Sequence, residues 1–175
     1  SGTIYFGMLS DGLIYLDPGS TETKNIAITG DLELSSDSWE VSFFLTERFR
    51  VESGGSIGYA PDSWWGPNLE IRSGSVEIPG RMDVPWSTVR FLPTTDVAMG
   101  LGDNAIANGS PYFIQSDQLF NNVAAWSVQI GDEYQYNEAF TVTGINNFDD
   151  AAFQDLSLNT RGDFTLPLGS TISFR

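Results

Sequence analysis

The run from Trp39 to Phe49 constrains the fold of this chain more than any other stretch. Large apolar side chains occupy every second position of its first part: Trp39, Val41, Phe43 and Leu45. The positions between them are polar apart from Phe44. Side chains alternate across a β-strand with a period of two, whereas a helix needs apolar residues three and four apart. The pattern therefore predicts a long central strand with these four side chains buried, each contributing about 1.5–3 kcal/mol of transfer free energy.

Turn-forming residues recur along the whole chain, which contains 18 glycines and 8 prolines. They separate about ten to thirteen short apolar runs at intervals of roughly 8–12 residues, a spacing typical of sandwiches and barrels. Asp11-Gly12, between two apolar runs, is a strong hairpin signal because both residues tolerate positive φ. Only residues 96–101 and the stretch that begins at Ser116, a candidate N-cap, favour a helical turn.

We therefore expect an all-β fold with little helix, an antiparallel two-sheet β-sandwich of the jelly-roll type. A chain of 175 residues suits one well-buried domain, and no composition shift marks a boundary, so residues 1–175 form a single predicted β-sandwich domain. Segments 30–34 and 162–166 both begin with Gly-Asp and continue with alternating apolar residues. This similarity indicates two like turn-to-strand entries rather than an internal repeat.

The charge and the missing residue types exclude several classes of function. The formal net charge is -15, which repels phosphate backbones and anionic lipid surfaces, so we expect no nucleic-acid partner. The chain contains no cysteine and no histidine, which removes disulfides, thiolate zinc sites and histidine-based nucleophilic catalysis. No apolar run approaches the roughly 18 residues of a membrane span, so no membrane insertion is expected.

Two aromatic loops are the candidate ligand-binding residues. Trp64 and Trp65 are adjacent in a loop bounded by prolines, and exposed indole faces can stack on sugar rings while Asp62 and Asn68 bond hydroxyl groups. Alternatively, one indole closes the end of the sandwich and the other packs at a subunit contact. Tyr134 and Tyr136 lie among acids and amides, a composition typical of adaptable binding loops and equally of a plain hairpin tip.

Acidic residues make calcium the candidate ion, and no other cofactor is expected. Asp149 and Asp150, with Asp155 five residues further on, supply hard oxygen ligands close together. Their spacing matches no EF-hand loop, and Asp-rich surface turns are common without metal. Arg161-Gly162-Asp163 matches the integrin-binding tripeptide, but it precedes a strand and is interpreted as a turn.

A paired-acid or nucleophile motif is not recognisable, so we expect no catalytic residues and no enzyme activity. The favoured function is a non-enzymatic structural or attachment module of an extracellular or virion assembly, acting through protein–protein surfaces as a homo-oligomer or with assembly neighbours. The expected location is extracellular or on a virion surface. A carbohydrate-binding module that uses the loop tryptophans to hold glycans is one alternative, and a β-jelly-roll glycosidase is the other.

Overall fold

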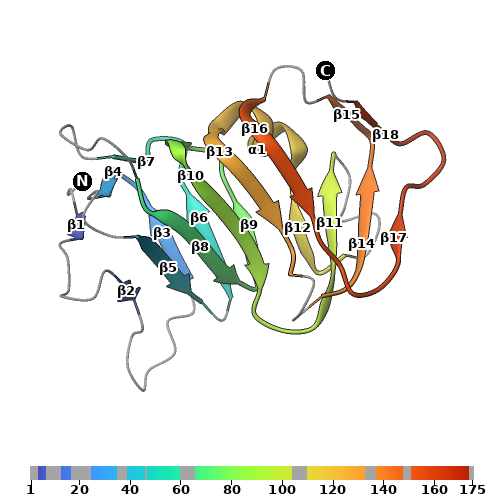
Figure 1. Ribbon diagram of the computed structural model, residues 1–175, viewed down its shortest axis with the longest axis horizontal. Helices are drawn as coiled ribbons and strands as arrows, with labels where there is room; N and C mark the ends of the chain where they lie inside the picture. Colours follow the sequence, from blue (N-terminus) through green and yellow to red (C-terminus); the bar gives the residue numbers. More distant parts are fainter. Residues whose placement is uncertain are drawn as a thin grey trace.

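The computed structural model describes residues 4–6, 13–16, 25–34, 39–45, 47–59, 66–103, 110–132, 137–147 and 151–173. Strands make up 65% of the structure and helix 6%, which confirms the predicted all-β character. All of the strand pairs within these residues are parallel. The chain winds into a parallel β-solenoid in which each turn of the chain, here called a coil, adds one strand to each of three faces (Figure 1).

Each face is a row of parallel strands from successive coils. The first face contains β1 (Ile4–Phe6), β4 (Asp31–Leu34), β7 (Ser56–Tyr59) and the first parts of β10 (Arg81–Pro93), β13 (Val123–Ile130) and β16 (Ala152–Leu158). The second face contains β2 (Leu13–Leu16), β5 (Glu40–Phe44), β8 (Asn68–Ser73) and the second parts of β10, β13 and β16. The third face consists of two sheets. One contains β3 (Asn25–Ile28), β6 (Arg48–Val51) and β9 (Ser75–Glu77), and the other contains β12 (Tyr112–Ile114), β11 (Val97–Gly102), β14 (Asn137–Thr143) and β17 (Phe164–Thr165). A separate pair is formed by β15 (Ile145–Asn147) and β18 (Thr171–Ser173).

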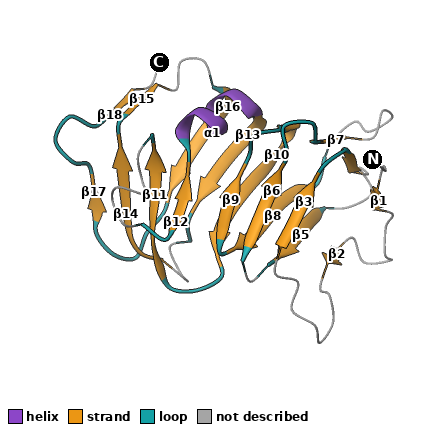
Figure 2. Cartoon of the chain, turned by 180° about the vertical axis from the view of Figure 1, so that it is seen from behind, coloured by secondary structure: helices purple, strands orange, loops and turns teal. Residues whose placement is uncertain are grey.

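The register reveals the length of a coil. Leu32 pairs with Ile57 and Ile57 with Met82, so these two steps are 25 residues each. The next partner of Met82 is Val123, because β12 and the helix α1 (Ser116–Asn122) are inserted in this coil. Figure 2 shows the helix at one end of the strands, where it covers a side of the solenoid.

Two amide side chains fasten α1 to the preceding coil. Gln118 Oε1 accepts the N–H of Ile78 at 2.6 Å, and Asn122 Nδ2 donates to the carbonyl oxygen of Ile78 at 2.7 Å. The helix begins after Gln115, which makes no side-chain cap, while Ser116 Oγ donates to Asp103 Oδ1 at 3.0 Å. The predicted helical turn is confirmed, but Ser116 as its cap is wrong.

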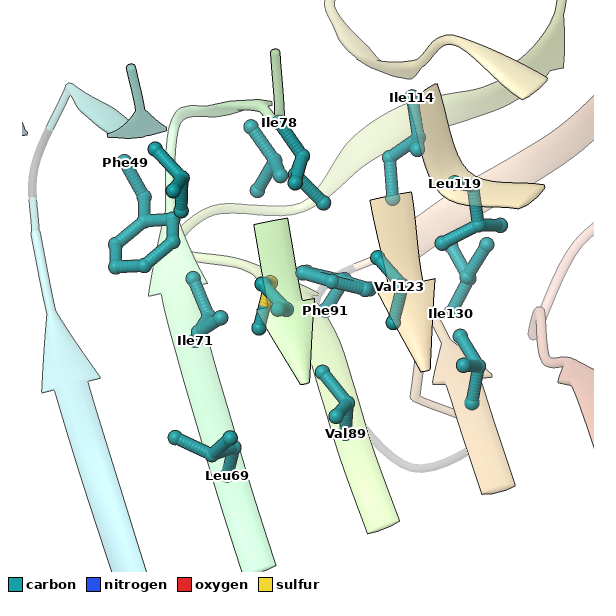
Figure 3. Packing of buried hydrophobic residues seen from close by; sticks show 14 of the residues in the cluster. Phe49, Leu69, Ile71, Ile78, Val89, Phe91, Ile114, Leu119, Val123 and Ile130 are labelled. Carbon is teal, nitrogen blue, oxygen red and sulfur yellow. The ribbon is translucent and has the colours of Figure 1, made fainter. Parts of the chain in front are cut away.

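Inward side chains of successive coils stack in columns and fill the interior. Val41, Leu69, Val89 and Val128 hold equivalent positions on the second face, and each is at most 1% exposed. Figure 3 shows part of this packing, with aliphatic and aromatic side chains from different coils meeting inside the solenoid. Burying such columns stabilises neighbouring coils together, since a single coil cannot bury its own apolar side chains.

The predicted antiparallel jelly-roll sandwich is wrong. The residue runs that flank Asp11-Gly12 do not pair with each other as a hairpin: β1 pairs with β4 and β2 pairs with β5, both in parallel. Parallel neighbours need a crossover of a dozen or more residues, and here the other two faces of each coil provide it. The predicted helical turn at residues 96–101 is wrong, because residues 97–101 lie in the β11 strand.

Candidate binding surface

The corner between the first and second faces carries a break in strand pairing. Val84 pairs with Ala125 and Thr88 with Ser127, so three residues of β10 oppose a single residue of β13, Trp126. Such a bulge bends a strand and turns side chains away from the regular alternation. Both strands continue around the corner, and consecutive residues can face outward there.

Three tryptophans lie on this corner, and we call Trp39, Trp86 and Trp126 the tryptophan corner. Trp86 is 61% exposed and lies in the bulge of β10, while Trp126 is 46% exposed and lies opposite the bulge on β13. Trp39 is 70% exposed and immediately precedes β5. Neighbouring strands are about 4.8 Å apart, so the three residues lie at different levels along one edge of the solenoid, with the coil of β8 between Trp39 and Trp86.

The backbone beneath Trp86 is held by a network of hydrogen bonds around the buried Ser87. Tyr59 Oη accepts the N–H of Trp86 at 3.1 Å and lies 2.7 Å from Ser87 Oγ, which donates to the carbonyl oxygen of Pro67. Since the Ser87 proton goes to Pro67, the Tyr59 hydroxyl donates to Ser87. A Cβ on Gly66 would lie 1.7 Å from Tyr59 Cε1, so a glycine is required where the ring passes. Burial raises the pKa of Tyr59, which keeps this network protonated.

Trp39 corrects one sequence prediction. Val41, Phe43 and Leu45 are at most 2% exposed, as the alternation predicts, but Trp39 is 70% exposed. Its carbonyl oxygen accepts the N–H of Asn68 at 2.9 Å, which places the residue at the end of the strand pair and at the corner. Alternation across a sheet holds only within a strand, and the corner lies outside it.

A row of polar side chains runs beside the tryptophan corner on the second face. We call it the polar shelf, and it consists of Glu40, Asn68, Thr88, Ser127 and Asp155. Glu40 pairs with Asn68, Ser127 pairs with both Thr88 and Asp155, and Asn68 Oδ1 accepts the N–H of Thr88 at 3.1 Å. Aromatic faces and hydrogen-bonding groups therefore lie in two adjacent parallel rows.

The two arginines of the second face, Arg72 and Arg90, form ion pairs with an acidic residue. Arg72 Nε lies 2.6 Å from Glu70 Oε1, and Arg90 Nη1 lies 3.8 Å from Glu70 Oε2. The Arg72 guanidinium also lies 6.0 Å from the centre of the Phe44 ring, a cation–π distance. Phe44, which interrupts the polar face of β5, thus packs with Arg72 within the chain.

Comparison with known proteins does not identify the function of this surface. The chain matches no protein-family model, and no curated protein or solved structure is significantly similar to it. The chemistry of the tryptophan corner and the polar shelf therefore carries the functional assignment.

Most of the predicted site residues lie outside the described residues. These are Asp62, Trp64, Trp65, Tyr134, Tyr136, Asp149 and Asp150. Asn68 lies on the polar shelf, half-buried and bonded to Thr88. Asp155 is exposed on β16, and within the described part of the chain no group of three or more acidic residues is arranged to hold a metal ion.

The Arg161-Gly162-Asp163 turn is tied into the fold. Arg161 Nη2 lies 2.6 Å from Asp96 Oδ2, and the carbonyl oxygen of Asp163 accepts the N–H of Phe140 at 2.9 Å. A Cβ on Gly162 would lie 1.3 Å from the carbonyl oxygen of Glu138, so close backbone approach requires this glycine. These contacts agree with the interpretation as a structural turn.

A surface hollow lies between the third and first faces. It has a volume of about 390 Å³ and is lined mainly by turn residues and small side chains: Ser53, Gly55, Pro79, Gly80, Arg81, Asn121, Asn122, Val123, Ala124 and Ala152. Its one charged side chain, Arg81, is bonded to Asp83 at 2.9 Å. This lining offers no pair of acid and base groups. Across the described residues, no helix has the length and apolar character needed to cross a membrane.

Sequence reasoning missed the tryptophan corner because its members are far apart in the chain. Trp86 and Trp126 are 40 residues apart, and the insertion in this coil hides the period that relates them. A usable signal was present in the runs Val84-Pro85-Trp86-Ser87 and Ala125-Trp126-Ser127, which both place Trp before Ser.

Proposed function

We propose that this protein is a non-enzymatic extracellular attachment module that binds carbohydrate chains through the tryptophan corner. One observation carries the proposal: Trp86 and Trp126 are 61% and 46% exposed on adjacent coils, on a backbone held by a buried network. An exposed indole offers a flat apolar face with a polar N–H edge, which suits a sugar ring and its hydroxyl groups. The polar shelf supplies hydrogen-bond partners beside it.

Other ligands that stack on indoles fit this surface less well. Nucleic-acid bases stack on exposed aromatic rings, but those proteins use a positively charged groove to follow the backbone. The net charge here is -15. A quaternary ammonium group favours a cage of several rings around the cation, whereas a convex corner presents its rings outward.

The polar shelf does not resemble a glycosidase site. Its two carboxylates, Glu40 and Asp155, lie on β5 and β16, which are separated by four strand spacings or about 19 Å. Paired glycosidase carboxylates are about 5–9.5 Å apart. The jelly roll on which the glycosidase alternative depended is also absent from this parallel fold.

Binding to a glycan array tests the proposal. Wild-type protein is expected to bind at least one carbohydrate polymer, and Trp86→Ala and Trp126→Ala are each expected to weaken that binding tenfold or more, which corresponds to about 1.4 kcal/mol. Leu168→Ala is the matched control, since Leu168 is a fully exposed apolar residue away from the corner. Thermal unfolding checks that each variant keeps its fold. Absence of binding to any glycan, or equal binding by all variants, would refute the proposal.

The C-terminal coil favours assembly as a second function. Inward residues of β16, among them Leu156 and Leu158, are only half-buried, and Phe164 is 48% exposed. Among the described strands, β16 pairs with β13 alone and β1 pairs with β4 alone. We infer that the free edge of β16 can pair in parallel with the β1 edge of a second copy. Such head-to-tail contacts are heterologous and build open chains of copies.

Light scattering at several protein and salt concentrations tests this assembly. The mass is expected to rise with protein concentration, and to rise further in salt, because salt screens the repulsion between acidic copies. Leu156→Asp on the open end is expected to reduce the mass to that of a monomer. Ser157→Asp, the next residue of the same strand with an outward side chain, is the control. A wild-type protein that is monomeric under every condition would contradict the assembly.

A further inference from the structure

Resting on the proposed function, the arrangement of the corner allows the class of carbohydrate and its direction to be specified. We infer that the ligand is an uncharged, extended polysaccharide that lies along the solenoid axis, with its internal sugar units on Trp39, Trp86 and Trp126. Three features carry this inference: the order of the tryptophans along one edge, the charge of the neighbouring groups and the exposure of the three indoles.

The order of the tryptophans sets the direction. Trp39 precedes β5, and Trp126 lies on β13, which is the third strand from β5 through β8 and β10. Three strand spacings amount to about 14 Å, so a single sugar ring cannot contact both indoles. The row follows the axis because each tryptophan lies at the same corner of its own coil. A ligand that contacts all three must therefore be an extended chain.

The neighbouring charges set the chemical class. The polar shelf carries carboxylates at Glu40 and Asp155, and the two shelf positions beside Trp86 and Trp126 are the neutral Thr88 and Ser127. The two arginines farther along the second face lie near Glu70, at 2.6 Å for Arg72 Nε and 3.8 Å for Arg90 Nη1. An anionic polysaccharide would therefore meet acidic groups, while both of these arginines already have an acidic partner. A polymer of uncharged sugars has no such cost.

The exposure of the three indoles sets the mode of binding. A pocket encloses the end of a chain and recognises its terminal sugar, whereas an exposed edge leaves both directions along the ligand open. Internal units of a polymer can therefore occupy the edge, and each added sugar that reaches another indole adds contact area. Affinity should grow with chain length until the chain extends from Trp39 to Trp126, and should not grow beyond it.

Affinity electrophoresis provides the first test of the ligand class. Native gels contain hydroxyethylcellulose, galactomannan or dextran as uncharged polymers, and alginate or polygalacturonate as anionic ones. At least one uncharged polymer is expected to retard the wild-type protein, and neither anionic polymer is expected to do so. Retardation by the anionic polymers alone would leave the carbohydrate function standing and overturn this inference. If none of these polymers retarded the protein and no arrayed glycan bound it, both this inference and the proposed function would be overturned.

Calorimetry with oligosaccharides cut from the retarding polymer provides the second test. Affinity is expected to rise with the number of sugar units and then to level off. Trp39→Ala is expected to make the affinity level off at a shorter chain length, and to weaken the binding of long oligosaccharides more than that of the shortest one that binds. Trp86→Ala is expected to weaken binding at every length. Equal affinity for short and long oligosaccharides, with no effect of Trp39→Ala, would show recognition of a chain end and would overturn the inference.

Discussion

Tyr112 shows how a single residue of the interior responds to its surroundings. Its side chain on β12 is completely buried and lies in register with Met99 of β11. Burial raises the pKa of the Tyr112 phenol, because the charged phenolate would lose its water. The hydroxyl group of Ser73 opposes this shift only in part, since its Oγ donates to the carbonyl oxygen of Ser75 at 3.0 Å. The neutral phenol is therefore the form that fits the core.

The raised pKa of Tyr112 leads us to expect a loss of folding stability at alkaline pH. Below pH 10 the phenol is protonated in both the folded and the unfolded chain, so its protonation has no effect on stability. Above the ordinary pKa of 10.0 the unfolded chain releases the proton while folded Tyr112 retains it. The free energy of unfolding then falls by up to about 1.4 kcal/mol per pH unit for this group. Urea unfolding at pH 8 to 11 should give a shallower decline for Tyr112→Phe. Identical slopes would contradict the argument.

At the scale of secondary-structure elements, the corner of β10 depends on one buried hydroxyl. Ser87 is fully buried, donates to the carbonyl oxygen of Pro67 and accepts from Tyr59. It joins three successive segments: the start of β8, the end of β7 and the bulge of β10. The exposed indole of Trp86 can keep a defined position only if this backbone is held, since a bulge leaves a residue without its regular strand partner.

The serine makes a specific prediction for stability and binding. Ser87→Ala leaves the Pro67 carbonyl oxygen and the Tyr59 hydroxyl short of a partner inside the protein, which should cost about 1–3 kcal/mol. Ser157→Ala, on the exposed side of β16, should change stability by less than about 0.5 kcal/mol. Chemical denaturation measures both. Ser87→Ala should also weaken glycan binding while Trp86 is still present. If the two serine variants were equally stable, the proposed network would make no contribution to the free energy of unfolding.

At the scale of the whole molecule, the solenoid spaces surface side chains at regular intervals. Each coil adds about 4.8 Å along the axis, so residues at one corner recur at a fixed spacing. The columns of buried side chains hold each coil against the next, which makes the surface rows as regular as the core beneath them. Strong negative charge on this frame favours solubility and limits association that is not specific. Inward side chains of β16, such as Leu156 and Leu158, are only half-buried, in contrast to those of the coils before it.

The sequence alone determined the type of element and much of the core. The alternation after Glu40 placed Val41, Phe43 and Leu45 inside a strand, and the structure buries all three. Glycine and proline positions indicated many short strands and little helix, because turn chemistry is local. Likewise, the turn at residues 161–163 follows from a local sequence pattern. Of the tryptophan corner and the polar shelf, the sequence predicts only Asn68 and Asp155 as site residues.

Only the tertiary structure decided how the strands pair and where the indoles lie. A strand with one buried face shows the same alternation beside a parallel neighbour as beside an antiparallel one, so the pattern at 39–49 is compatible with both. The coil length that separates the two alternatives is 25 residues at Leu32 and Ile57 but 41 residues between Met82 and Val123. That insertion conceals the repeat. Trp39 reads as a core residue from its neighbours, yet it is exposed, because a corner between two faces is created by pairing between coils and not by the local sequence.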